Sequence, residues 1–477
     1  MSEAAGLIAD RARPGGEPRV RCPSDAMRSP AGAVPARLPR RWLATRVVRA
    51  AAAAIIAPLA HRGAVAVVDQ AIVSATSFAT SMFIGRLCTK EEFGIYFIAL
   101  SVVFFVRGVQ DNIISAPYMI YCHRRRDAEL AIYSGSSLAH HVALSLATLA
   151  GLTALECVLW AGMGPATLIP VILVLLGAAP LMLLREFVRQ FSFAHLHVWT
   201  AVILDAAVAA LQLGTLLLLG CFHRLSPVTI YATMGGACAI AAAGWFLSTR
   251  HPMQLTRARA LADWWHNWAF GKWALAGQLI GSAATYLLPW ILVSACGEAE
   301  TGMLAACATL IGVANMFVTG MGNFLVPRTA GAFAAGGVGA LGRVLGKAGA
   351  LYTAFFALFG VLVLAAGEQL TVLIYGAKYS GVGPILGLLA LAMFADALGR
   401  VAGNGLWAME RPSANFLADV CSLFVLIVSA VCLIRPLGVI GVAIVQLSAT
   451  LTGTAVRGVT LLRLAQSLRI EAAGGNA

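Results

Sequence analysis

Residues 69–120 read DQAIVSATSFATSMFIGRLCTKEEFGIYFIALSVVFFVRGVQDNIISAPYMI. Two long apolar runs flank one short charged connection in this stretch. A helix of about 20 apolar residues matches the ~30 Å hydrocarbon thickness that it must cross. The stretch therefore predicts a pair of membrane-spanning helices.

Similar apolar runs recur along all 477 residues, of which 60% are hydrophobic and only 12% are charged. That charged share is about half of the usual share in soluble domains, which excludes a soluble globular fold. We therefore predict an all-α polytopic membrane protein with about 12 transmembrane helices. The expected spans lie near 64–86, 93–120, 133–160, 165–186, 198–220, 228–248, 271–295, 302–326, 344–366, 382–408, 414–434 and 438–462. The stretch from Gln369 to Tyr375 is apolar but short, and we expect a re-entrant or interfacial piece there.

The first 60 residues form a separate, basic segment. They carry ten arginines against four acidic residues, within a chain of formal net charge +13. Beside a membrane domain, such a segment is typical of a cytosolic tail near anionic headgroups, and we expect no nucleic acid partner. We predict that residues 1–60 are a mostly disordered cytosolic tail, with a helix at 41–60 on the inner membrane surface.

The basic residues of the short connections predict the orientation. Alternate connections carry thirteen Lys and Arg in one set, including Arg124 to Arg126, and only five in the other, including Arg86 and Lys378. The positive-inside rule places the richer set and both termini in the cytosol.

An internal repeat relates the first and seventh spans at a constant offset of 208 residues. Gln70 aligns with Gln278, and Glu92-Phe93-Gly94 aligns with Glu300-Thr301-Gly302. Cys88 and Cys296 obey the same offset, and we expect both thiols to react from outside. A duplication of six spans predicts two six-helix lobes, 61–262 and 263–477, as in a rocking transporter. The Trp-rich segment from Asp263 to Trp273 is expected to be an interfacial helix that joins them.

Four motifs carry a family resemblance: GRLCTKEEFGIYFIALS at 85–101, LIYGAKYSGVGPILGLLAL at 373–391, WAMERPS at 407–413 and RPLGVIGVAI at 435–444. They resemble the polysaccharide transporters, or O-antigen-type flippases, of the multidrug, oligosaccharidyl-lipid and polysaccharide exporter superfamily. The resemblance implies two six-helix lobes around a central cavity. It also implies translocation of a polyprenyl-diphosphate-linked oligosaccharide across the bacterial inner membrane, for surface or exopolysaccharide assembly. The implied partners are this lipid and a polysaccharide polymerase or export complex.

Ionisable residues inside the spans are the candidate site residues, because each needs a partner or a wet cavity. Arg107 and Asp111 lie four residues apart on one helix face, and Asp396 and Arg400 repeat the spacing in reverse order. Each pair either neutralises itself or faces a cavity. In the superfamily the first, second, seventh and eighth helices line the cavity, and guanidinium groups suit a diphosphate. The expected substrate-binding residues are Arg107, Asp111, Asn112, Gln70, Gln278, Arg400 and Asp396.

Several other polar residues lie in or near the spans. Asp69 either binds a coupling ion or lies at the interface, and the second role is favoured because it opens its span. Glu186 is expected to be solvated at a helix end. His195 and His197 fall in a connection without a clear carboxylate partner, so we expect no metal site, and no cofactor motif occurs.

Three functions compete at this point. The leading one is the flippase, and the second is a cation-coupled drug exporter of the same fold, whose cavity would favour acidic groups. The third is a membrane polymerase or glycosyltransferase, but the longest expected outer connection, 367–381, is too short for its active site. Since the sequence also lacks a nucleophile with a base and a phosphate-binding G-x-x-x-x-G-K-[ST] loop, we expect a transporter without catalytic residues.

Overall fold

The computed structural model describes residue 65, residues 68–248 and residues 252–474. The basic segment 1–60 lies outside the described residues. The described part consists of helices and short connections, and no strand occurs in it, so the predicted all-α class is confirmed.

The first helix covers residues 68–87. The elements of the N-terminal half then follow as α2 (Lys90–Gln110), η1 (Asp111–Ser115), α3 (Ala116–Tyr121), η2 (Cys122–Arg124), α4 (Asp127–Trp160), η3 (Ala166–Leu168), α5 (Ile169–Ala194), α6 (Val198–Cys221) and α7 (Pro227–Ser248). The next elements are α8 (Arg257–Gly281), α9 (Ala283–Cys296), α10 (Glu298–Gly312), α11 (Asn315–Tyr375), η4 (Ala377–Tyr379), α12 (Gly383–Ala408) and α13 (Pro412–Gly474). Below, the N-terminal half means residues 68–248 and the C-terminal half means α9 to α13.

Eight of the described helices are long and apolar enough to cross a membrane, or nine if α8 and α9, which meet at a 46° bend, count as one span. Two of them, α11 and α13, are divided by glycines: Gly337 and Gly438 have φ values of 57°, which an α-helix excludes and glycine tolerates. If α8 and α9 count as one span, α11 and α13 are divided at these glycines, and the helix over 68–87, which is not among the eight, is added, the described residues contain twelve segments, the number of spans that the sequence predicts.

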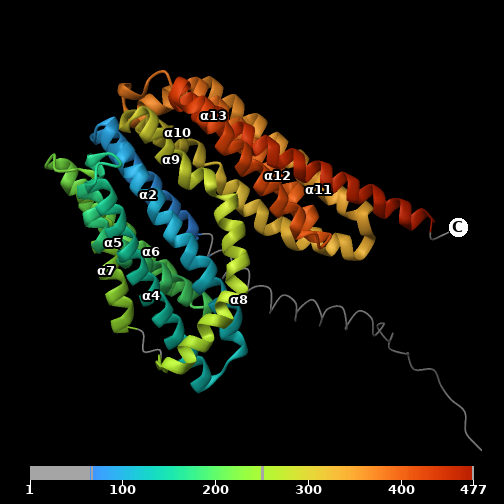
Figure 1. The fold of residues 1–477 in the computed structure, drawn as a ribbon, viewed down its shortest axis with the longest axis horizontal. Coiled ribbons are helices and arrows are strands. Elements are labelled where there is room, and N and C mark those ends of the chain that lie inside the picture. Colours follow the sequence, from blue (N-terminus) through green and yellow to red (C-terminus); the bar gives the residue numbers. More distant parts are fainter. Residues whose placement is uncertain (1–64, 66–67, 249–251, 475–477) are drawn as a thin grey trace, which may run out of the picture. The chain divides into compact units, whose positions relative to one another are not determined.

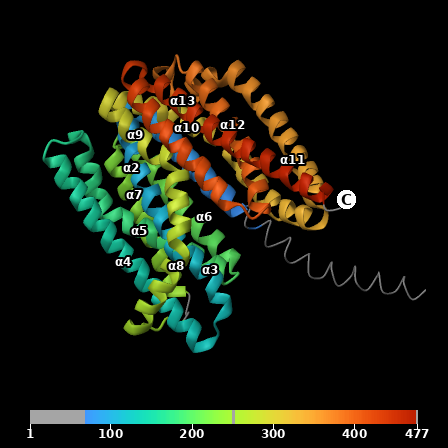
Figure 2. The same ribbon diagram turned by 45° about the vertical axis from the view of Figure 1, so that its right-hand side comes forward.

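The two halves form separate groups of helices (Figure 1), and the turned view in Figure 2 shows the same grouping. Within the N-terminal half α5 packs against α4, α6 and α7, and within the C-terminal half α12 packs against α11 and α13. Direct contact between the halves is concentrated on α2 and α10, which run side by side.

The α2–α10 contact uses the repeat found in the sequence. Thr89 and Glu92 form a capping box that starts α2: the Glu92 amide donates to the Thr89 hydroxyl at 3.2 Å, and the Thr89 amide donates to Glu92 Oε2 at 2.8 Å. One turn later Gly94 lies against α10, where a Cβ would sit 2.1 Å from the Glu298 carbonyl oxygen. A Cβ on Gly302 would sit 2.0 Å from the Lys90 carbonyl oxygen. The repeated glycines therefore allow the two backbones to touch.

The predicted helix over residues 263–273 is present and joins the two halves, whereas its position at the membrane interface stays a prediction. This segment is part of α8, which packs against α4 and η1. Arg125 and Asp263 form an ion pair at 3.0 Å, and the Tyr133 hydroxyl donates to Asn267 Oδ1 at 2.9 Å. Asp263 and Asn267, which lie next to tryptophans in the sequence, thus anchor α8 to the N-terminal half.

Of the two interpretations of residues 369–375, the re-entrant piece is wrong, and the interfacial position stays a prediction. These residues continue α11 to Tyr375, and Gly376, with a φ of 102°, ends the helix. The short η4 follows directly and leads to α12. The apolar stretch is short only because it is the last part of a longer helix.

Candidate functional site

A π-helical turn interrupts the second span at the candidate residues. Five residues, Asp111–Ser115, adopt the wider π geometry, and Arg107 lies in the last turn of α2 just before it. The Asn112 side chain donates from Nδ2 to the Gly108 carbonyl at 2.8 Å, and Gln110 donates to the Leu183 carbonyl of α5 at 3.0 Å. Such turns are rare and occur often at functional sites, because they redirect side chains.

Helix α5 brings two further arginines into the site. It does not end near residue 186 as expected but continues to Ala194, and residues Arg185 and Arg189 lie within it, not in a connection. The continuation is reasonable because arginine, glutamate and glutamine favour helices, and the break comes only near Leu196, with a φ of 58°.

Arg189 forms the centre of a buried ion network. Its guanidinium contacts Asp69 at 2.6 Å, Asp205 at 2.7 Å and Glu186 at 3.2 Å. Asp69 is fully buried, and Glu186 and Asp205 are each 2% exposed. A carboxylate that is buried away from water needs hydrogen-bonding and charged partners, and the several N–H groups of one guanidinium can serve more than one carboxylate.

Glu186 extends the network toward α2. It contacts Arg185 at 3.2 Å and Arg107 at 3.1 Å, while Arg107 also lies 3.7 Å from Asp111. Arg185 in addition pairs with Asp205. The network thus joins three arginines to four carboxylates, Asp69, Asp111, Glu186 and Asp205, with a formal charge of −1 when all are ionised. Arg107, with 34% of its side chain exposed, and Asp111, with 37%, form its accessible end.

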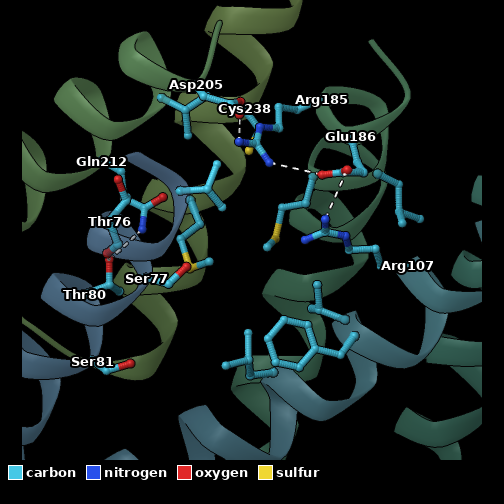
Figure 3. Close-up of a pocket in the computed structure, with 18 of the residues that line it drawn as sticks. Thr76, Ser77, Thr80, Ser81, Arg107, Arg185, Glu186, Asp205, Gln212 and Cys238 are labelled. Atoms are coloured by element: carbon cyan, nitrogen blue, oxygen red, sulfur yellow. Dashed lines mark hydrogen bonds and ion pairs between the residues drawn. The ribbon is translucent and has the colours of Figure 1, made fainter. Parts of the chain in front are cut away.

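A cavity of about 140 Å³ lies beside this network, within the N-terminal half. Figure 3 shows the charged groups Arg107, Arg185, Glu186 and Asp205 on one side and the hydroxyl groups of the first helix on the other. The hydroxyl side consists of Thr76, Ser77, Thr80 and Ser81, with Gln212 donating to Thr80 at 2.8 Å. Pockets for drug-sized ligands have volumes of roughly 300–1,000 Å³, so this cavity is suited to water or a small polar group.

The structure brings together some of the predicted residues and separates others. Gln278 lies near the α2 site, because a Cβ on Gly108 would meet its Cγ at 4.0 Å. Gln70 and Gln278 are exposed and make matching bonds: each donates to the serine four residues later, Ser74 at 3.4 Å and Ser282 at 3.0 Å. The two glutamines thus preserve the repeat in their hydrogen bonds.

Asp396 and Arg400 belong to a different cluster, in the C-terminal half. They pair with each other at 2.7 Å on α12, and both side chains are exposed, by 38% and 56%. A second pair, Arg457 and Asp419, lies within α13. Gly399, Gly403 and Gly453 leave room for the Arg457 side chain.

Two sequence expectations are therefore corrected. Asp69 is not interfacial, since it is fully buried against Arg189, and Glu186 is not solvated, since it is bound to three arginines. Arg185, Arg189 and Asp205 were absent from the expected site. The signal that could have found them is the Arg185/Arg189 spacing of four, with Glu186 between, in a segment free of glycine and proline.

Arg189→Met is expected to destabilise the protein by about 3–5 kcal/mol, because it leaves buried carboxylates unpaired. The measurement is thermal aggregation of the full chain in detergent, which should begin at a lower temperature than for the wild type. Lys347→Met, at an exposed lysine of α11, is the control. Combining Arg189→Met with Asp69→Asn should raise the aggregation temperature part of the way back to that of the wild type, and no such rise would contradict the pairing of Arg189 with Asp69.

No protein-family model matches the chain, and no curated protein matches it by sequence. Solved structures do match. An inward-facing multidrug resistance MATE family transporter of the MOP superfamily aligns with a TM-score of 0.70 at 14% identity, covering 83% of this chain and 95% of that one. The lipid II flippase MurJ, in an inward closed conformation, aligns with a TM-score of 0.62 at 13% identity, covering 82% and 86%. An outward-facing MATE family transporter of the MOP superfamily gives 0.57 at 14% identity, covering 84% and 94%.

The chain thus has the fold of a class of polytopic membrane transporters that includes MATE proteins and MurJ. The fold that the resemblance implies is confirmed, whereas membership of the superfamily and of its polysaccharide-transporter branch stays a prediction.

Proposed function

We propose that the protein is a flippase that moves a polyprenyl-diphosphate-linked oligosaccharide across the bacterial inner membrane by alternating access. The observation that supports this substrate is Arg107. Its guanidinium is one-third exposed at the end of a buried network, beside Gly108, which faces Gln278 and Tyr286 of α8 and α9. A diphosphate offers the paired oxygen acceptors that a guanidinium binds best.

The network lets Arg107 exchange partners. If Arg107 turns from Glu186 to a diphosphate, Glu186 keeps Arg185 and Arg189, both at 3.2 Å. The buried carboxylate therefore stays neutralised, and the contact of Arg107 with Asp111, at 3.7 Å, is loose. Arg185 and Arg189 would act as positioning residues, whereas Arg107 touches the substrate. The 140 Å³ cavity is too small for the oligosaccharide, which would occupy space between the halves.

The C-terminal pair would serve as a second anionic contact. Arg400 is more exposed than Arg107 and has Asp396 as its ion-pair partner within the described residues. Gln70 and Gln278, both exposed, would bind sugar hydroxyls, and Asn112 would maintain the π turn through its bond to Gly108.

The second candidate, a cation-coupled exporter of drugs or other small molecules, is favoured by one observation. The network holds four carboxylates against three arginines, so one negative charge is uncompensated. An organic cation or a coupling ion would balance it. Asp69 is a poor coupling site in this conformation, because Arg189 already occupies it.

The proposed orientation puts both termini in the cytosol and the Gly94–Gly302 contact at the outer face, in agreement with the Lys and Arg distribution. A polysaccharide polymerase or export complex would receive the product outside. Reporter fusions at the C-terminus, active only in the cytosol, test this orientation.

A gene deletion distinguishes the two candidates. For the flippase we expect loss of surface polysaccharide and accumulation of lipid-linked oligosaccharide, both restored by the wild-type chain. Unchanged polysaccharide together with increased sensitivity to organic cations would instead support the exporter.

A further inference from the structure

The end of α11 and the η4 turn insert into the N-terminal half at the proposed outer face. Tyr375 and Tyr379 are both fully buried there. Their rings lie 5.9 Å and 6.4 Å from the ring of Phe93, which belongs to the repeat motif of α2. Gly85 leaves space for this insertion, because a Cβ on it would lie 2.3 Å from Tyr375 Cδ1.

Two cations cross between the halves in opposite directions at this place. Arg86 donates from Nη1 to the Leu373 carbonyl at 3.1 Å, and Lys378 donates from Nζ to the Cys88 carbonyl. Each acceptor lies at the C-terminal end of a helix, α11 for Leu373 and the helix over 68–87 for Cys88. The last carbonyls of a helix lack partners within it and carry partial negative charge. Each half therefore caps a helix of the other half.

These bonds are suited to repeated release. Within the described part of the chain, neither Arg86 nor Lys378 forms an ion pair with a carboxylate. Each cation therefore leaves only a helix end behind when the halves part. Water can satisfy an exposed helix end, whereas a buried carboxylate would need a new partner.

We propose that residues 373–379 form a latch that holds the outer face shut and that must leave the N-terminal half before the transporter opens outward. The proposal rests on the alternating access proposed above. Its test measures the conformation of the outer face and not the movement of lipid, so the two can fail separately.

Cys88 is a native reporter of the latch. The residue is 4% exposed, and its backbone carbonyl accepts the hydrogen bond from Lys378. In this conformation Cys88 is shielded from solvent, and its reaction with a reagent added outside stays a prediction. Burial, helped by Glu92, raises the pKa of the Cys88 thiol to about 12, while Lys378 lowers it. Removing Lys378 would by charge alone make the thiol less reactive, so any gain in labelling must come from exposure.

The experiment compares Lys378→Met and Arg86→Met with the wild type in the full chain. Intact cells are treated with a membrane-impermeant maleimide, and modification of Cys88 is quantified by mass spectrometry. We expect labelling to rise several-fold in both variants and further in the double variant. Lys347→Met, a lysine of the same helix α11 outside the latch, should label like the wild type.

Equal labelling in the wild type, the control and both latch variants, at matched protein levels, would overturn the proposal. Labelling that rises only in inside-out vesicles would also overturn it, because the latch would then lie on the inner face. If Lys378→Met does not accumulate, Arg86→Met decides alone, since Arg86 is exposed and its loss leaves the tyrosine packing in place.

Discussion

Arg107→Ala is expected to lower export of the lipid-linked oligosaccharide at least tenfold while the chain still accumulates in the membrane. The substitution removes the exposed guanidinium but leaves Glu186 paired with Arg185 and Arg189. A charge-assisted hydrogen bond contributes about 1.5–3 kcal/mol, so losing one should lower the transport rate by roughly tenfold to a hundredfold, and losing two by roughly a hundredfold to ten-thousandfold. Surface polysaccharide per membrane-inserted protein is the measurement.

Two further variants serve as controls for Arg107→Ala. Arg107→Lys keeps the charge without the fork and should retain part of the activity. Arg328→Ala removes an arginine of α11 that contacts the Phe324 ring, and it should export normally. Normal export by Arg107→Ala at matched expression would show that Arg107 is not a substrate contact. Loss of the protein from the membrane would favour a purely structural ion pair.

Gly94→Ala is expected to stop transport by preventing closure of the outer face. The added methyl group would meet the Glu298 carbonyl oxygen, an atom of the α10 backbone, at 2.1 Å, and Gly302→Ala would meet Lys90 in the same way. Alanine is about 1 kcal/mol better than glycine inside a helix, so α2 itself should be strengthened. A defect must therefore come from the contact between the halves.

A cysteine at position 101 can report whether the contact between the halves opens. Ser101 is a buried residue of α2 that accepts a hydrogen bond from Trp290 of α9 at 3.0 Å, so Ser101→Cys places a thiol at this contact. In this background Gly94→Ala should increase labelling by an impermeant thiol reagent added outside. Gly244→Ala, at an α7 glycine with open space around it, is the control. Normal transport and unchanged labelling in Gly94→Ala would contradict a closed α2–α10 contact.

The helices were predictable because membrane crossing imposes a length on apolar runs, and this constraint needs no knowledge of packing. The repeat was also visible in the sequence, because equivalent residues lie at a constant offset. The structure preserves it: Gln70 and Gln278 make the same hydrogen bond, and Gly94 and Gly302 each approach the backbone of a helix in the other half. What the glycines do could not be read from the repeat. A glycine in an apolar helix is a common residue, and only the position of α10 shows that it faces a backbone.

The site was only partly predictable for a related reason. Arg107 and Asp111 stand out inside an apolar run, whereas Arg185 and Arg189 follow one and therefore resembled a cytosolic connection. Burial at a helix end depends on neighbouring helices, which hydropathy does not describe. The π turn at Asp111 depends on tertiary contacts as well, including the approach of Gly271 to the Asn112 backbone.

Flipping by the purified full-length chain in proteoliposomes tests the central claim most directly. The probe is undecaprenyl diphosphate bearing a fluorescent oligosaccharide in both leaflets, and an impermeant reductant quenches only the label that faces outward. The proposed function predicts that wild-type protein exposes the inner-leaflet label to quenching, whereas Arg107→Ala vesicles retain it. If the fluorescence of the inner-leaflet label stays unquenched in wild-type vesicles, as in protein-free vesicles, the proposed function is contradicted. Transport of an organic cation such as ethidium by the same vesicles would then favour the exporter.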